Sequence, residues 1–236
     1  MNVSSQDNRH SPSDPLVIAL DGPAGVGKST VAMAVADALG LAYVETGALY
    51  RAVALLARRA GLEFDQHAAL AKLAADMSVQ FTMVEGINRV VVDGQDLTDA
   101  LRAPDMGPAA STVSAIPEVR TALMELQRGF GRVSPGAVAE GRDIGTVVFK
   151  TASYKFFLTA DVEERVRRRV EQLVQKGKNV DSDQVRQEVE ARDSADSGRK
   201  VAPLKPADDA IILDSTSMNA QQVIRAILTT VRGTHE

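Results

Sequence analysis

The sequence predicts an α/β protein built on a doubly wound, five-stranded parallel sheet. The first observation is a set of five short apolar runs, at residues 16–20, 41–44, 137–140, 154–158 and 210–214. Residues 16–20 are wholly apolar, and such a run is typical of a parallel strand that is buried on both faces. The second observation is that segments of helical character alternate with these runs, and this alternation indicates a parallel sheet.

The helices in the first part of the chain have recognisable ends. Residues 29–39 have helical character and stop at Gly40, a residue type that often follows a helix C-terminus. A second helix is predicted over residues 46–60, with the Thr46 hydroxyl as its N-cap. A third helix is predicted over residues 65–77.

The pattern then changes from helices to a β-hairpin. Residues 79–84 and 89–93 are strand-like, and the turn Glu85-Gly86-Ile87-Asn88 separates them. Because this hairpin interrupts the alternation of strands and helices, we expect residues 62–105 to form an inserted subdomain with a small antiparallel sheet.

The second half of the chain returns to alternation. Helices are predicted over residues 118–128, 161–176, 182–192 and 219–232. Asp161 and Glu164 have the spacing of a capping box at the start of the second of these helices.

Composition excludes several classes of protein. The chain has no cysteine, which excludes disulfide frameworks and Cys-based zinc sites and suits the cytoplasm. Its net charge of −4 argues against a protein that coats nucleic acid. No apolar run approaches the ~20 residues of a membrane span. Residues 1–14 are polar and predict a disordered tail rather than a signal peptide.

A glycine-rich loop follows the first predicted strand. Gly22-Pro23-Ala24-Gly25-Val26-Gly27-Lys28-Ser29 matches the P-loop pattern G-x-x-x-x-G-K-[ST], and Thr30 follows it. Such a loop turns backbone N–H groups toward phosphates, and the next helix directs its positive end at them. Lys28 can bridge the β- and γ-phosphates, and the Ser29 hydroxyl can ligate Mg²⁺. The sequence therefore predicts a site for ATP and Mg²⁺ over residues 22–30.

Other features narrow the class of nucleotide-binding protein. The base-reading Asn/Thr-Lys-x-Asp string of GTPases is absent. Three apolar runs end in an acidic residue, at Asp93, Glu140 and Asp214. Glu140 is the best candidate for a second magnesium contact, because it precedes the polar segment Gly141-Arg142-Asp143.

Arginine is unusually frequent and falls at informative positions. Of the 27 Lys and Arg residues, 19 are arginine. This excess suits phosphate binding, although codon bias explains it equally well. The positions of the arginines in the chain must therefore distinguish the two explanations. Arginines occur in residues 46–51, 141–143, 165–169 and 192–199. Two of these segments follow core strands, where doubly wound sheets bind ligands.

The chain resembles bacterial cytidylate kinases over about residues 15–232. The matching strings are Asp21 to Thr30, Thr46-Gly47-Ala48-Leu49-Tyr50-Arg51, Ala110-Ser111, Glu140-Gly141-Arg142-Asp143-Ile144-Gly145-Thr146-Val147-Val148-Phe149, Arg192-Asp193 with Asp196, and Ala202-Pro203-Leu204. Adenylate-type kinases would carry Asp-Gly-Phe-Pro-Arg in place of the Gly-Arg-Asp-Ile-Gly-Thr string. Glu140 departs from the Asp that is common in the family, which leaves its reach toward magnesium open.

The resemblance implies a fold, a reaction and a division of the chain. It implies a P-loop kinase fold in which ATP phosphorylates CMP or dCMP. It also implies a core formed by residues 15–61, 106–158 and 193–232. The insertion over residues 62–105 would bind the nucleoside monophosphate, and residues 159–192 would form a helical lid. We expect a monomer that needs neither nucleic acid nor a membrane.

The resemblance also implies a role for each matching residue. The acceptor phosphate would be held by Arg51, Arg142 and Arg199. The base would be read by Ser111, Arg120 and Asp143, and the sugar by Arg192 and Asp196. Thr46 and Tyr50 complete the predicted acceptor site, although Tyr50 is as well explained by packing. Arg165, Arg168 and Arg169 would lie on the mobile lid. The predicted catalytic set is Lys28, Arg142, Arg199, Arg165 and Arg169.

Each assignment has an ordinary alternative. Arg51 could be a surface residue of a helix, and Arg142 and Asp143 could form a local ion pair. The arginines of residues 165–169 could form solvated pairs with Glu163 and Glu164, which lie one helical turn away. The rival activities are kinases for UMP, AMP or a small acceptor such as shikimate, and a regulator that binds ATP without catalysis.

Overall fold

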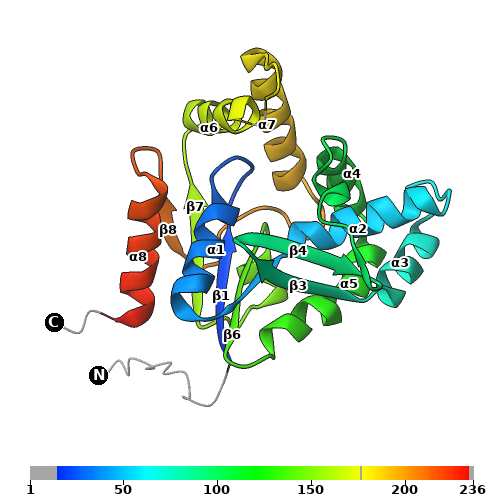
Figure 1. Ribbon diagram of the computed structural model, residues 1–236, viewed down its shortest axis with the longest axis horizontal. Helices are drawn as coiled ribbons and strands as arrows, with labels where there is room; N and C mark the ends of the chain where they lie inside the picture. Colours follow the sequence, from blue (N-terminus) through cyan, green and yellow to red (C-terminus); the bar gives the residue numbers. More distant parts are fainter. Residues whose placement is uncertain (1–14, 176, 234–236) are drawn as a thin grey trace.

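The protein is described by a computed structural model, which covers residues 15–175 and 177–233 (Figure 1). The tail predicted over residues 1–14 lies outside this range. The central sheet is parallel and has the strand order β2-β6-β1-β7-β8. Its strands are β1 (Leu16–Asp21), β2 (Ala42–Glu45), β6 (Gly136–Gly141), β7 (Tyr154–Thr159) and β8 (Ile211–Asp214). Each corresponds to one predicted apolar run, so the predicted fold class is confirmed.

The two faces of the sheet are covered by different elements. On one face Ile18, Leu20 and Phe156 are buried against α1 (Lys28–Leu39) and α8 (Ala220–Arg232). On the other face the small side chains of Ala19, Ala137 and Ala139 pack against the π-helical turn η2 (Ile144–Val148). Because these residues are alanines, η2 can lie close to the sheet, beside the paired ends of β1 and β6.

The predicted insertion contains a helix and a small antiparallel sheet. Its elements are α3 (His67–Asp76), β3 (Val79–Val84), β4 (Ile87–Val92), β5 (Gln95–Asp96) and a 3₁₀ turn (Ala100–Arg102). The predicted hairpin is confirmed, but its turn is shorter than predicted. Val84 pairs with Ile87, so only Glu85 and Gly86 lie in the turn, with φ values of 51° and 75°. Two left-handed residues in a two-residue turn suit the twist of a hairpin.

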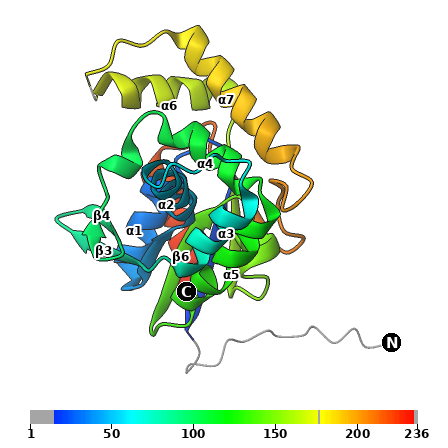
Figure 2. The same cartoon turned by 90° about the vertical axis from the view of Figure 1, so that its right-hand side faces the viewer.

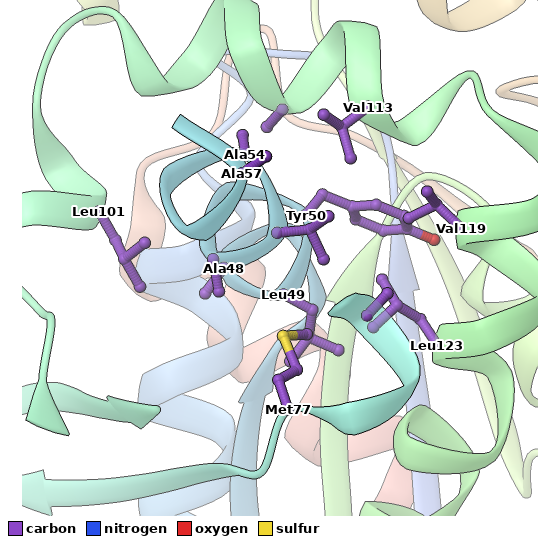
Figure 3. Packing of buried hydrophobic residues seen from close by; sticks show 14 of the residues in the cluster. Ala48, Leu49, Tyr50, Ala54, Ala57, Met77, Leu101, Val113, Val119 and Leu123 are labelled. Atoms are coloured by element: carbon purple, nitrogen blue, oxygen red, sulfur yellow. The ribbon is translucent and has the colours of Figure 1, made fainter. Parts of the chain in front are cut away.

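The insertion shares one hydrophobic core with its neighbours in sequence. α2 (Thr46–Arg59), α4 (Met106–Ser114) and α5 (Pro117–Gly131) pack with α3 and the hairpin, and Figure 2 looks onto these helices, which lie on the right-hand side of Figure 1. Figure 3 shows Leu49, Met77 and Leu123 pointing toward one another inside this core. Packing is therefore continuous across the boundaries predicted at residues 62 and 105.

Leu49 lies at the centre of this shared core and provides a test of its contribution to stability. We expect Leu49→Ala to lower the free energy of unfolding by about 3 kcal/mol, because Leu49 is 0 % exposed and its loss leaves a cavity. Urea unfolding would measure the change. The control is Met83→Ala in the hairpin, since Met83 is 47 % exposed and should lose less than about 0.5 kcal/mol. Equal losses in the two variants would contradict a core centred on Leu49.

Two helices lie beyond the carboxyl ends of the strands (Figure 1). They are α6 (Val162–Gln175) and α7 (Ser182–Ser197), and Val166, Val185 and Val189 pack between them. The prediction that the second helix ends near Arg192 is wrong, because it continues to Ser197. Ion pairs of Asp196 with two arginines stabilise this extension, although the local residues are weak helix formers.

The capping box predicted at the start of α6 does not form. The backbone N–H of Asp161 donates to Thr216 Oγ1 at 3.0 Å, and the Glu164 carboxylate accepts from Arg167 and Arg168 instead. Within residues 15–175 and 177–233, no helix has the length and apolar character needed to cross a membrane.

Candidate active site

The glycine-rich loop lies between β1 and α1, as predicted. Gly25 and Gly27 have φ values of 75° and 94°, which favour glycine over other residues. A Cβ on Gly22 would lie 2.1 Å from the Leu158 carbonyl oxygen, so the loop passes too close to β7 for any side chain there. The Lys28 ammonium is buried and donates to the Pro23 carbonyl oxygen at 2.7 Å. The loop is therefore a tight backbone turn that carries one buried cation.

The electrostatic surroundings of Lys28 favour an anionic ligand. Burial, together with the positive charge of Arg142, holds the pKa of Lys28 well below its usual value, while Glu140 opposes this shift. A phosphate group bound beside the loop would give the ammonium a negatively charged partner.

Three side chains with oxygen atoms lie together beside β2, β6 and the start of α1, namely Tyr43, Glu140 and Ser29. The Tyr43 hydroxyl donates to Glu140 Oε1 at 2.6 Å, and Glu140 is buried. Burial and Glu140 raise the pKa of Tyr43 well above its usual value, whereas a hydrogen bond with Ser29 lowers it. Hydroxyl and carboxylate oxygens are the ligand types that Mg²⁺ prefers. Ser29 and Glu140 therefore fit a magnesium ion that takes its other ligands from phosphates and water.

The position of Thr46 corrects one expectation from the sequence. Thr46 is the first residue of α2 rather than its N-cap, and the preceding residue, Glu45, occupies the cap position without a side-chain cap bond. The Thr46 hydroxyl donates instead to the Glu140 carbonyl oxygen at 2.7 Å. Its hydrogen bond therefore connects α2 to the end of β6. The residues that follow Glu140, Gly141-Arg142-Asp143, are called the acceptor segment below.

Two arginines from different parts of the chain converge on one carboxylate. Asp196 is 2 % exposed and accepts from Arg142 Nε at 2.6 Å and from the Arg199 guanidinium. Arg199 also donates to Ser114 Oγ at 2.9 Å. Asp196, predicted to contact the sugar, thus lies between two of the arginines predicted to hold the acceptor phosphate.

Two more arginines surround this pair and leave an excess of positive charge. Burial lowers the pKa of Arg192 to about 10, and the charges of Arg142, Arg51 and Arg169 contribute. Arg51 pairs with Glu45. Among the residues that the structure describes, the buried Nε atoms of Arg51 and Arg192 have no hydrogen-bond partner. Such a cluster of cations, with donors left over, suits an anionic ligand.

The predicted base-reading residues lie together beside this cluster. Arg120 and Asp143 form a buried ion pair, and Arg120 also donates to the Ser114 carbonyl oxygen at 3.1 Å. Burial raises the pKa of Asp143, and the neighbouring Arg120 limits that rise. Ser111 lies one helical turn before Ser114 on α4.

Tyr50 contributes mainly to packing. Its ring lies 5.5 Å below the Arg120 guanidinium and points toward Val119 and Leu123 in the shared core (Figure 3). Burial raises the pKa of the Tyr50 hydroxyl to about 12, so this group is neutral at physiological pH.

The arginines predicted on the lid have different surroundings. Arg165 is buried and donates to the Ala160 and Ala24 carbonyl oxygens at 3.0 and 3.2 Å. Arg168 donates to the Val26 carbonyl oxygen at 3.2 Å and to Ser215 and Met218 after β8. Both therefore hold the backbone of the glycine-rich loop. The alternative of pairs with glutamates holds for Arg167, which pairs with Glu164 and Glu171, and in part for Arg168, which also pairs with Glu164. The Arg169 guanidinium donates to Gln172 and lies near Arg192.

The structure adds two residues that sequence reasoning missed. Ser114 contacts Arg199 through its hydroxyl and Arg120 through its carbonyl oxygen, so it joins the arginine cluster to the Arg120–Asp143 pair. Asp193 pairs with Arg165 and accepts from the Ala24 N–H at 3.4 Å. Asp193 was visible in the sequence as the neighbour of Arg192, whereas nothing local distinguished Ser114.

Comparisons with known proteins identify the family that this chain resembles. The family model described as cytidylate kinase matches residues 18–233. The chain is 49% identical over 216 residues to a cytidylate kinase of Syntrophotalea carbinolica, and the match covers 92% of each chain. It is 48% identical over 214 residues to a cytidylate kinase of Pseudomonas aeruginosa PAO1, with 90% of this chain and 93% of the relative covered.

A solved structure supports the fold alone. An uncharacterized protein from Eubacterium ventriosum is similar with a TM-score of 0.50 and 10% identity, over 92% of this chain and 99% of the other. The family match and the two close relatives each cover most of the sequence, and the glycine loop and arginine cluster lie inside the matched region. This chain therefore belongs to the cytidylate kinase family.

Proposed function

We propose that this chain transfers the γ-phosphoryl group of ATP to CMP and to dCMP, giving ADP and CDP or dCDP. One observation carries the proposal. A lysine-bearing glycine loop and a cluster of arginines with unsatisfied donors lie at the carboxyl ends of neighbouring strands. Each of these regions suits one anionic ligand, so two phosphorylated molecules can be held close together.

The glycine-rich loop would bind ATP. Its backbone N–H groups would surround the phosphates, and the Lys28 ammonium would stabilise the charge that develops on the transferred group. Ser29 and Glu140 would hold Mg²⁺, which would supply positive charge to offset the charge that develops on the phosphates. Arg165 and Arg168 would keep the loop in shape through their bonds to Ala24 and Val26.

The arginine cluster would bind the acceptor phosphate. Arg51, Arg142 and Arg199 would contact it, and Arg192 and Asp196 would lie beside the sugar. The acceptor oxygen is already negatively charged, so this chain needs no general base to activate it. Its task is to orient the acceptor and to neutralise the repulsion between two anions.

The Arg120–Asp143 pair would select the base. An ionised Asp143 accepts a hydrogen bond from the amino group of cytosine, whereas uracil would oppose it with a carbonyl oxygen. Arg120 and Ser111 would supply donors on the same side. A site that loses such a hydrogen bond can discriminate by ~10⁴-fold.

Water must be excluded, because ATP would otherwise be hydrolysed. The α6–α7 pair lies over the carboxyl ends of the strands and contacts the glycine loop through Arg165 and Asp193. Closure of this lid on the bound nucleotides would remove water from the reacting phosphates. Monomeric state and cytoplasmic location stay predictions.

A change at Glu140 tests the proposed magnesium contact. Glu140→Gln removes a negative charge while preserving shape, so the Mg²⁺ concentration for half-maximal velocity should rise about 10-fold or more. A titration of initial rate against Mg²⁺ measures it. The control is Asp214→Asn at the end of β8, whose carboxylate accepts from Thr216 and should leave the titration unchanged. An unchanged curve for Glu140→Gln would remove Glu140 from the magnesium site.

An acceptor panel tests the activity itself. ADP release from MgATP would be measured with CMP, dCMP, UMP, AMP, shikimate and no acceptor. We expect CMP and dCMP to give the highest kcat/KM. A higher value for another acceptor would assign a different kinase activity, and ATP binding without acceptor-dependent ADP release would indicate a regulator.

A further inference from the structure

A buried carboxylate outside the proposed binding sets joins the two halves of the site. Asp21 is the last residue of β1 and directly precedes Gly22 of the ATP loop. It is 3 % exposed. Its Oδ1 accepts from the Ile144 N–H and its Oδ2 from the Gly145 N–H, each at 2.8 Å. These two N–H groups directly follow Arg142 and Asp143 in the chain.

The parallel sheet explains why Asp21 can reach this segment. β1 and β6 are neighbours, and Asp21 lies opposite Gly141 in their register. The chain leaves the sheet at both positions, in one case into the ATP loop and in the other into the acceptor segment. Asp21 is therefore attached covalently to the first and by two hydrogen bonds to the second.

Both oxygens of the carboxylate are needed. The N–H groups of Ile144 and Gly145 begin η2, and the first N–H groups of a helical turn have no acceptor within that turn. Burial raises the pKa of Asp21 to about 6, with the bonds from Gly145 and Ile144 opposing the rise. Near pH 7.5 the group is therefore mostly ionised and offers two acceptors.

The surroundings leave little freedom for this contact. A Cβ on Gly145 would lie 3.2 Å from Lys155 Cδ and 3.5 Å from Asp21 Oδ2. On the other side of the segment, the Thr46 hydroxyl holds the Glu140 carbonyl oxygen. The segment over residues 141–143 is thus held at both ends, and Asp21 provides the hold nearest to the ATP loop.

We propose that Asp21 is a positioning residue that sets the place of Arg142 and Asp143 relative to the ATP loop, and thereby determines acceptor selectivity. The inference rests on the proposed roles of Arg142 and Asp143. If one of the two hydrogen bonds is lost, the acceptor segment can shift while the glycine loop keeps its own contacts with Arg165 and Arg168. Loss of one of these hydrogen bonds should therefore weaken the recognition of CMP rather than the binding of ATP.

The substitution Asp21→Asn tests this inference, because it preserves volume but turns one acceptor oxygen into an amide donor facing an N–H. We expect kcat/KM for CMP to fall about 10- to 100-fold, as for a misplaced catalytic group. The ratio of kcat/KM for CMP to that for UMP should fall at least about 10-fold. The KM for MgATP should change less than about 3-fold, since Lys28 and the loop N–H groups are unaltered.

The matched control is Ile144→Val, which trims a buried side chain but keeps its N–H bond to Asp21. It should lower the thermal midpoint without changing the CMP-to-UMP ratio. Asp21→Ser, which retains one hydroxyl acceptor, serves as a second variant if Asp21→Asn does not fold.

Several results would overturn the inference. A lower midpoint with an unchanged CMP-to-UMP ratio would make Asp21 structural only. Equal losses for ATP and CMP would assign it to the ATP loop, and failure of both Asp21 variants to fold would make it a folding residue. The unchanged chain is measured first. If it shows no preference for CMP, the proposed function fails, whereas a retained preference in the folded variants refutes the role of Asp21 alone.

Discussion

Lys28→Ala should lower kcat at least about 100-fold, the usual effect of removing one preorganised transition-state donor. Lys28 is the one lysine of the glycine-rich loop, and its ammonium is held over that loop by the Pro23 carbonyl oxygen. Its surroundings lower its pKa because it is buried near Arg142, so a phosphate would relieve an unfavourable charge. Steady-state rates of ADP release with saturating CMP and MgATP would measure the loss.

The matched control for this prediction is Lys155→Ala. Lys155 is also a buried lysine at a strand of the central sheet, but its ammonium pairs with Asp209. We expect its removal to lower stability and to change kcat less than about 3-fold, because it stabilises no charge on the transferred group. If Lys28→Ala kept near-normal turnover while remaining folded, Lys28 would have no catalytic role.

Asp143→Ala should erode the preference for CMP over UMP. The ratio of the two kcat/KM values is expected to fall by a large part of the ~10⁴-fold that one buried hydrogen bond can supply. The reason is that uracil no longer meets an opposing carboxylate, while cytosine loses its acceptor. Competition between the two acceptors at fixed MgATP would measure the ratio.

The same substitution should also cost stability. Asp143 and Arg120 form a buried pair, and removing one partner of such a pair typically costs about 3–5 kcal/mol. Asp143→Asn is therefore the volume-matched variant for the kinetic measurement. Asp105→Ala is the control, since Asp105 pairs with Arg58 at an exposed position. An unchanged CMP-to-UMP ratio in a folded Asp143 variant would mean that another group reads the base.

Local sequence patterns were sufficient to predict the fold class and the ATP loop. The five strands follow from short apolar runs, although β8 is an exposed edge strand rather than one buried on both faces, with Ile211 and Ile212 42 % and 52 % exposed. The glycine loop is equally local, since the positive φ values of Gly25 and Gly27 and the close approach at Gly22 all require glycine. The hairpin was predicted for the same reason, and only its turn was too long.

Contacts between distant segments could not be predicted from local patterns. Thr46 has the sequence context of an N-cap, yet its hydroxyl bonds to Glu140, a partner 94 residues away. Asp193 and Ser114 act through partners on other elements, so their own neighbours in sequence do not distinguish them. Arg168 has helical spacing to Glu164 and pairs with it, but its second contact, to the Val26 carbonyl oxygen of the ATP loop, is not visible in the local pattern.

The chain uses its charges in two different ways, and the structure separates them. Arg167, Glu164 and Glu171 form exposed pairs on α6, which contribute little to stability. The arginines around Asp196 are half-buried, and they outnumber the carboxylates that they contact. An excess of buried positive charge is costly in an empty site and favourable once a phosphate enters, which is why this cluster indicates binding rather than stability.

A crystal structure with CMP and a non-hydrolysable ATP analogue would test the central claim most directly. We expect the phosphates of the analogue to lie against the loop over residues 22–29, and the CMP phosphate to contact Arg142 and Arg199. An oxygen of the CMP phosphate should then face the γ-phosphorus in line with the bond that breaks. CMP bound away from these two arginines, or turned so that its base faces the ATP loop, would contradict the account.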